Sequence, residues 1–223
     1  AAGAGAPFSV TEPAGFGAAE FQARTGVSRE TLDRFETWRR RLEETNAHTN
    51  LVGRSTLREF WYRHAYDSWQ LLDLAPGAAR WADLGAGAGF PGLAIAFGLM
   101  ERGVEGAHVI LVESIAKKAA FIQAVARETG APVSVSAERA ERLDPAPVVD
   151  VVTARAMAPL RKLLAHVHPY VEKGAIALLP KGARHAEELT EARKSWTLEP
   201  EVIPSATAPE AAILKIRTLT RDR

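Results

Sequence analysis

The segment Asp83–Gly92, with the sequence DLGAGAGFPG, constrains the fold of this chain more than any other feature. It follows a short apolar run that predicts a strand, 80–84, and it precedes an apolar run long enough for a helix, 92–100. Glycines at a strand-to-helix turn allow unusual backbone dihedrals and let a ligand approach closely. In an open α/β sheet, ligands bind outside the carboxyl ends of the strands. The sequence therefore predicts a ligand site at this turn.

After Gly77 the chain alternates between short apolar runs and stretches with helical periodicity. The runs that predict strands are 80–84, 109–112, 133–136, 149–153, 175–179 and 213–217, with a weaker one near 197–203. The helices expected between them cover 92–100, 115–129, 160–170 and 184–194. Strands that alternate with helices indicate a mostly parallel sheet with helices on both faces. We therefore expect an α/β domain over 78–223, built on a seven-stranded sheet.

The sequence before this domain has a helical pattern over 16–77. Ser28 is a plausible N-cap for the first long helix, and Ser55 is a plausible N-cap for a second. Apolar residues recur at helical spacing after the first cap, at Leu32, Phe35, Trp38 and Leu42. Residues 1–15 are rich in Ala, Gly and Pro and are expected to form a flexible tail.

The 223-residue chain has no cysteine and a formal net charge of +1. The lack of cysteine excludes disulfides, thiolate metal ligands and cysteine nucleophiles. The six histidines are scattered without the spacing of paired ligands, so we expect no metal site. The chain has neither an apolar run of the ~20 residues that a membrane helix needs nor a recognisable secretory signal. We therefore expect a cytoplasmic protein without membrane association.

Two kinds of nucleoside cofactor fit the glycine segment. From Gly87 the sequence matches the bare G-x-G-x-x-G pattern of dinucleotide binding, but Pro91 removes a backbone N–H that a phosphate would use. From Asp83 it matches the D-x-G-x-G-x-G pattern of S-adenosylmethionine methyltransferases, whose cofactor has no phosphate. In that interpretation Asp83 or a neighbour would hold the cofactor's ammonium group. An ordinary strand-to-helix turn is a third interpretation, which the three alternating glycines disfavour.

An acid, Glu113, follows the second predicted strand. A carboxylate at this place can accept hydrogen bonds from both hydroxyls of a ribose. It suits the adenosine of either cofactor and does not choose between them. Alternatively, Glu113 only begins the next helix, where an acid complements the helix dipole.

Together these features resemble the bacterial 16S ribosomal RNA guanine-N7 methyltransferases, also called the glucose-inhibited division protein B family. The resemblance covers roughly Trp38 to Lys181. Besides the glycine segment with its Phe-Pro-Gly ending, it is carried by 46–52 (NAHTNLV), 63–68 (RHAYDS), 112–114 (VES) with Lys117, Lys118 and Phe121, 137–139 (AER) and 153–156 (TARA). The stretch around Gly98–Gly106 departs from the family pattern without touching these motifs. The resemblance implies a Rossmann-like class I S-adenosylmethionine methyltransferase with an N-terminal helical extension.

The resemblance also implies a cofactor site and a methyl acceptor. The residues expected to bind S-adenosylmethionine are Asp83, Gly85, Gly87, Gly89, Phe90, Glu113, Ser114, Ala137, Glu138 and Arg155. The implied acceptor is N7 of one guanine in 16S ribosomal RNA, in a loop near the decoding site. The partner is then the free RNA or the small ribosomal subunit, and we expect the enzyme to act as a monomer.

Guanine N7 carries a lone pair at neutral pH, so its attack on a methyl sulfonium needs no general base. Catalysis should come from alignment, from positive charge near guanine O6 or a phosphate, and from the removal of water. We assign these roles to Arg155, Asn50 and Lys181. The alternatives are a surface ion pair for Arg155 and ordinary solvation for Lys181. Asn46 and Asn50 could also brace the loop over the site.

A basic cluster before the sheet could contact RNA, or it could be a solvated face. Its members are Arg39, Arg40, Arg41, Arg54, Arg58 and Arg63. The nearby aromatics Trp61, Tyr62 and Tyr66 would suit RNA stacking, but several of them fall on the apolar face and are expected in the core. His64 is expected to be packed and hydrogen-bonded rather than catalytic. Three rival functions stay open: a nicotinamide-dependent oxidoreductase, a cofactor- or RNA-binding protein without catalysis, and a methyltransferase for another RNA or a small molecule.

Overall fold

The computed structural model describes residues 15–49, 51–53, 57–143 and 145–222. The segment before the sheet is helical, with α1 (Ala18–Thr25), α2 (Arg29–Thr49), the π-helix η1 (Phe60–Tyr66), α4 (Asp67–Trp69) and α5 (Leu71–Leu74). Ser28 Oγ accepts a hydrogen bond from Thr31 N at 3.2 Å, which confirms the first predicted N-cap. Ser55, the second predicted cap, and most of the predicted tail lie outside the described residues.

A seven-stranded sheet forms the centre of the molecule, in the order β3-β2-β1-β4-β5-β8-β7. Its strands are β1 (Arg80–Leu84), β2 (His108–Val112), β3 (Val133–Ser136), β4 (Val151–Thr153), β5 (Ile176–Lys181), β7 (Glu201–Pro204) and β8 (Ala212–Ile216). The first five are mutually parallel, and β8 runs antiparallel to both β5 and β7. The predicted mostly parallel sheet is confirmed. The single weak strand predicted near 197–203 is wrong, because the chain forms two strands there.

The second of these strands is β7, and the first, β6 (Trp196–Leu198), pairs with β9 (Leu219–Arg221) in a separate two-stranded sheet. Sequence analysis missed β9. Four helices connect the strands of the main sheet: α6 (Gly92–Glu101), α7 (Ala116–Thr129), α8 (Leu160–Val171) and α9 (His185–Ala192), and a short 3-10 helix, η2 (Ala140–Arg142), follows β3. The four longer helices lie within two residues of the predicted bounds.

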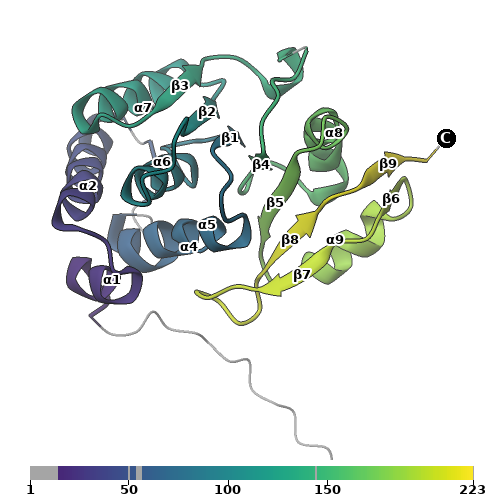
Figure 1. Ribbon diagram of the computed structural model, residues 1–223, viewed down its shortest axis with the longest axis horizontal. Coiled ribbons are helices and arrows are strands. Elements are labelled where there is room, and N and C mark those ends of the chain that lie inside the picture. The colour runs from purple at the N-terminus through teal and green to yellow at the C-terminus, as the bar shows by residue number, and fades with distance from the viewer. Residues whose placement is uncertain (1–14, 50, 54–56, 144, 223) are drawn as a thin grey trace, which may run out of the picture.

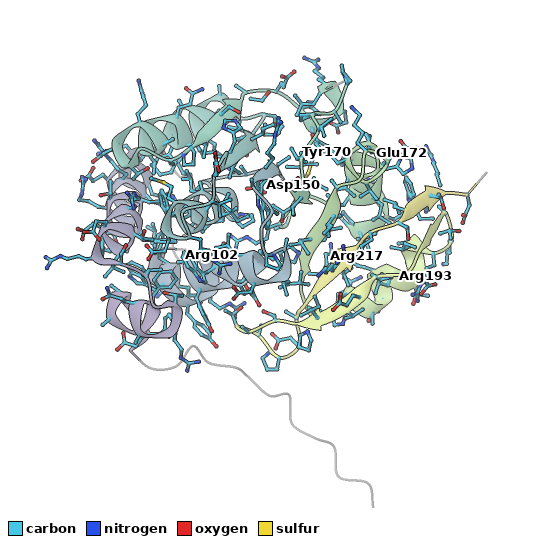
Figure 2. The ribbon with its side chains drawn as sticks, viewed as in Figure 1. Arg102, Asp150, Tyr170, Glu172, Arg193 and Arg217 are labelled. Carbon is cyan, nitrogen blue, oxygen red and sulfur yellow. The ribbon has the colours of Figure 1, made fainter. Side chains whose placement is uncertain are left out.

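Two apolar cores lie on opposite faces of the sheet, because side chains alternate along each strand. Trp81 of β1 belongs to the core that includes α1, α2, α6 and α7, whereas Ala82 and Leu84 belong to the core under α8 and α9. Figure 1 shows these helix groups on either side of the strands, with β6 and β9 at the C-terminal edge. Figure 2 labels Arg102 on the side of the N-terminal helices and Tyr170 on α8.

Helix α6 begins at the glycine segment and is enclosed from both sides. Every residue from Gly92 to Leu99 is buried, between the sheet and the helices of the N-terminal segment. A helix that is apolar all round needs cover on every side. The N-terminal helices supply that cover, so they are packed directly against the element that carries the predicted ligand site.

Three arginines of α2 that belong to the predicted basic cluster, Arg39, Arg40 and Arg41, form ion pairs on its surface rather than a free basic face. These pairs join Arg39 to Glu36 and Glu43, Arg40 to Glu44 and Glu128, and Arg41 to Glu44 and Glu128. Glu128 lies on α7, so part of this network links two neighbouring helices. Because their charges are matched by acids, these arginines are poor candidates for RNA contacts.

Candidate cofactor and acceptor cleft

A cleft of about 1010 Å³ opens at the carboxyl ends of β1, β2, β4 and β5. It is bounded by the glycine segment, by η1, by the loop after β4, by the start of α9 and by the loop between β7 and β8. Ligand pockets typically span roughly 300–1,000 Å³, so the cleft has room for a nucleoside cofactor and an acceptor group together. This is the place where the sequence predicted a ligand site.

The three alternating glycines adopt backbone conformations that other residues rarely take. Gly85, Gly87 and Gly89 have φ values of +72°, +60° and +105°. A Cβ on Gly85 would lie 3.1 Å from Met157 Cγ, at the cleft wall. Gly85 N and Ala86 N both donate to the carbonyl of Val112, at 2.8 and 3.0 Å, which ties the segment to the end of β2. The loop is thereby held with its backbone against the cleft.

Asp83 lies beneath the glycine segment and does not line the cleft. Its Oδ2 accepts a hydrogen bond from Gly92 N at 2.9 Å, while its buried Oδ1 has no partner among the described residues. Burial raises the pKa of this carboxyl to about 7. The structure thus shows Asp83 bracing the turn into α6. A direct contact with the cofactor's ammonium group stays a prediction.

Asp83→Asn should change how the free energy of unfolding depends on pH. The pKa of Asp83 is about 7 in the folded chain against an ordinary value of 3.8, so its stabilising effect is present below pH 3.8 and is lost as pH rises to 7. The unfolding free energy of the wild type minus that of the variant should fall by about 4 kcal/mol between these limits and stay flat above them. Urea titrations of both proteins at several pH values measure this difference, and a difference independent of pH would contradict the assignment.

Glu113 occupies the position expected for a ribose-binding acid. It is 6% exposed and lines the cleft. Its Oε2 accepts from Gly87 N at 2.8 Å and its Oε1 accepts from Ile115 N at 2.7 Å. A carboxylate has about four acceptor sites, so both oxygens can still accept a hydroxyl. Glu113 therefore both begins the turn before α7 and remains able to bind a ribose.

The other acids and small residues expected near the cofactor lie at the same edge of the sheet. Glu113 N donates to Ser136 O, and Ser136 Oγ donates to Glu138 Oε1 at 2.6 Å, which connects the ends of β2 and β3. Ala137 and Ser114 are exposed next to these groups. None of Ser114, Ala137 and Glu138 lines the cleft, so their contact with the cofactor stays a prediction.

Arg155 reaches into the middle of the cleft from the loop after β4. Its guanidinium lies 5.1 Å from the centre of the Phe90 ring, and its Nη1 lies 3.7 Å from Asp67 Oδ2. Nη1 also donates to the carbonyl of Arg63 at 3.4 Å. Burial lowers the pKa of Arg155, and the carboxylates of Asp67 and Asp83 oppose that shift. The predicted surface ion pair is thus a partly buried one, within the candidate site.

His64 is packed, as predicted, with its ring centre 4.9 Å from that of Phe90. The expectation that it is also hydrogen-bonded is wrong for Nδ1, which is buried without a partner among the described residues. Burial, with smaller effects from Arg155 and Arg63, lowers the pKa of His64 to about 3. His64 is therefore a neutral ring in the cleft wall at physiological pH.

Lys181 also lines the cleft, at the end of β5, but it is paired. Its Nζ lies 2.7 Å from Glu188 Oε2, which also accepts from Leu160 N at 2.7 Å. Asn50 lies outside the described residues. Asn46 Oδ1 accepts from Val52 N at 2.8 Å, so Asn46 braces the segment that brings Leu51 and Val52 to the cleft.

Several cleft residues were given no role by sequence analysis. Asp67 is part of the RHAYDS motif, but its spacing gave no sign that it faces Arg155. Ser205 and Thr207 come from the loop between β7 and β8 and carry no local signal, because they are distant in sequence from Asp67 and from the glycine segment. No group of three or more metal-ligating side chains suited to a metal ion occurs within the described part of the chain. Nor does any described helix have the length and hydropathy to cross a bilayer.

The cleft fits S-adenosylmethionine better than a dinucleotide. Glu113 can accept ribose hydroxyls, and the glycine segment offers close backbone approach. Two of the segment's own amides, Gly85 N and Ala86 N, already donate to Val112 O, and Gly87 N donates to Glu113. Few N–H donors are then left for a diphosphate, which would need them.

Solved structures with the same fold include methyltransferases. The O-methyltransferase from Bacillus cereus, in complex with SAH, superimposes with a TM-score of 0.56 at 12% identity over 81% of this chain and 90% of its own. A putative O-methyltransferase from Klebsiella pneumoniae gives a TM-score of 0.55 at 13% identity, over 89% and 94% of the two chains. These two likenesses show that the chain has the class I methyltransferase fold.

The particular family follows from sequence comparison. The model of the family described as rRNA small subunit methyltransferase G matches residues 31–214. The ribosomal RNA small subunit methyltransferase G of Rhodospirillum centenum is 49% identical over 202 residues, 90% of each chain. The protein of the same name from Caulobacter vibrioides is 45% identical over 98% of this chain and 97% of its own. The chain belongs to the rRNA small subunit methyltransferase G family.

Proposed function

We propose that this enzyme methylates N7 of one guanine in 16S ribosomal RNA, in a loop near the decoding site. The observation that supports this most is the convergence of basic side chains beyond the glycine segment. Arg63, Arg155, Lys181 and Arg184 line the cleft. Arg155 and Lys181 lie at the ends of β4 and β5, on the half of the cleft that is separated by β1 from β2 and Glu113. We call this half the acceptor half. A guanine with its flanking phosphates is an anionic ligand with acceptors at O6 and N7, which suits such a surface.

The cofactor half is formed by the glycine segment and Glu113. S-adenosylmethionine supplies an electrophilic methyl group when it is bound. Glu113 would accept the ribose hydroxyls, and Gly85 and Gly87 would let the backbone lie against the cofactor. Phe90 lies where the two halves meet, and its ring packs beside both His64 and Arg155. These rigid contacts would fix the position of the methyl group relative to the acceptor.

The charges of the acceptor half suit a reaction in which the positive charge of the sulfonium passes to the guanine and leaves a neutral thioether. A guanine methylated at N7 carries a positive charge, so an acceptor site with only unpaired cations would oppose product formation. Here the cations Arg155 and Lys181 are each accompanied by an acid, Asp67 and Glu188. The pairs can orient O6 or a phosphate while the site stays close to neutral. Because N7 needs no deprotonation, the neutral His64 has no proton to remove.

The target base would leave its stack to enter the cleft, as bases do in other enzymes that modify them. We propose that the enzyme works as a cytoplasmic monomer on the small subunit or on its RNA.

The test is methyl transfer from labelled S-adenosylmethionine to small subunits and to free 16S RNA from a strain that lacks this modification. Nucleoside mass spectrometry should find one 7-methylguanosine per RNA, and fragment mapping should place it in the loop near the decoding site. A matched RNA transcript made with 7-deazaguanosine has no N7 and should accept no methyl group. Labelling at another atom or in another loop would overturn the assignment. Cofactor binding without any transfer to either substrate would overturn the proposed acceptor.

A further inference from the structure

Asp67 lies where three segments distant in sequence meet at the acceptor half. It begins α4, directly after η1. Its Oδ1 accepts hydrogen bonds from Thr207 Oγ1 at 2.5 Å, from Gln70 Nε2 at 2.9 Å and from Ser205 Oγ at 3.4 Å. Its Oδ2 faces Arg155 Nη1 at 3.7 Å. One carboxylate therefore connects the N-terminal helices, the loop between β7 and β8, and the arginine of the site.

The two oxygens of Asp67 have separate partners. Three neutral donors hold Oδ1 in place, so the direction in which Oδ2 points is fixed by groups other than Arg155. Gln70 strengthens the arrangement, because its Oε1 accepts from Ala206 N at 2.9 Å within the same loop. The side chain of Asp67 is 17% exposed, so this geometry is largely protected from solvent. The carboxylate is oriented before any ligand is bound.

Arg155 depends on such a partner. Its side chain is 19% exposed, and a buried guanidinium needs a nearby counter-charge. Phe90 fixes one face of the guanidinium but accepts no hydrogen bond from its N–H groups. Its hydrogen bond to the carbonyl of Arg63, at 3.4 Å, supplies no full negative charge. Among the described residues, Asp67 is the one carboxylate that forms an ion pair with Arg155.

We propose that Asp67 is a positioning residue: through Oδ2 it holds Arg155 over Phe90, and through Oδ1 it fixes the loop containing Ser205 and Thr207 at the acceptor half. The inference rests on the proposed function, in which Arg155 acts at the junction of cofactor and acceptor. It predicts that an acid far from the glycine segment controls the site through Arg155. Asp67 itself need not touch either substrate.

The test begins with Asp67→Asn, which keeps the size of the side chain. An amide has one oxygen and one NH₂ group, so it can accept from Thr207 only by turning donors toward Arg155. The variant should lower kcat for methyl transfer by about 100-fold, as expected when a reacting group is misplaced by about 1 Å. Binding of S-adenosylhomocysteine, measured by calorimetry, should weaken much less than kcat falls.

A matched control is Asp73→Asn, in the same helical segment. Asp73 also pairs with an arginine, Arg102, at 2.5 Å, but the pair lies outside the cleft. This variant should change kcat by no more than about twofold, because exposed ion pairs contribute little. Equal effects of the two substitutions would overturn the positioning role, since a general effect on folding would then account for both.

The decisive comparison is Asp67→Asn in an Arg155→Lys background. If Asp67 acts through Arg155, the second substitution should reduce kcat much less there than in the wild type, because the shared interaction is already disrupted. The same fold-loss in both backgrounds would overturn the inference. S-adenosylhomocysteine binding is measured for every variant, and it does not depend on which RNA is methylated. A wrong acceptor would therefore appear as wild-type protein that binds this ligand without transfer, and a wrong role for Asp67 would appear as additive losses.

Discussion

Arg155→Ala should lower kcat/KM for methyl transfer by about 100-fold or more, the loss typical when one preorganised charged donor is removed from an active site. Arg155 is the side chain that contacts both the floor of the cleft at Phe90 and the acid at Asp67. Alanine removes the positive charge between the two halves of the cleft and leaves Asp67 without its counter-charge. Incorporation of labelled methyl groups into small subunits that lack the modification measures the effect.

The control for this prediction is Arg102→Ala. Arg102 also combines an acid with an aromatic ring, since it pairs with Asp73 and lies 5.9 Å from the centre of the Trp69 ring. It lies on the side of the N-terminal helices, as labelled in Figure 2, and does not line the cleft. This variant should retain activity within about twofold, as expected for an exposed ion pair. If Arg155→Ala behaves like Arg102→Ala, Arg155 is only a structural ion pair.

Trp38→Phe should weaken cofactor binding, although Trp38 is buried in α2 and is distant in sequence from the glycine segment. The indole Nε1 donates to the carbonyl of Ala88, in the glycine segment, at 3.0 Å, and the indole ring lies 4.2 Å from that of Phe90. Phenylalanine removes the donor and leaves a buried carbonyl unpaired, which costs about 1–3 kcal/mol. The unfolding temperature should fall by roughly 2–4 °C for each kcal/mol, and the affinity for S-adenosylhomocysteine should fall with it.

Trp196→Phe separates a general loss of stability from an effect on the cofactor loop. Trp196 is 4% exposed and donates from Nε1 to the carbonyl of Arg161 at 3.2 Å, on the other face of the sheet. The two variants should lose similar stability, but only Trp38→Phe should weaken ligand binding by calorimetry. If Trp196→Phe weakens it equally, the link from Trp38 to the glycine segment has no special role.

The strands that the sequence predicts correctly are those whose limits follow from a local apolar pattern rather than from their pairing partners. The bounds of β1 and β3 match the prediction, because each is a short apolar run between turn residues, and this local pattern is sufficient. The region 197–203 misled the prediction, since Pro200 separates two strands that enter different sheets. No local pattern distinguishes β6 from β7; the pairing of β6 with the distant β9 does so.

For the candidate site, too, the sequence predicted the local features but not the contacts between distant segments. The glycine segment and Glu113 act through their own backbone conformation and their place at a strand end, both of which are local properties. Asp67 accepts a hydrogen bond from Thr207, 140 residues away, and pairs with Arg155, 88 residues away. No spacing rule in the sequence predicts contacts over such distances. The burial of His64 likewise depends on neighbours from other segments.

The sequence by itself determined the alternation of strands and helices from β1 to α9, the candidate ligand-binding turn and the family, because these follow from local periodicity and from short motifs. Only the tertiary structure decided which charges are free and which are paired. Arg39, Arg40 and Arg41 of α2 are paired with acids, Lys181 is paired with Glu188, and Asp83 is buried beneath the glycine segment. The physical reason is that burial and ion pairing depend on distances in space between segments, and these distances are set when α6 and the sheet are covered by the N-terminal helices.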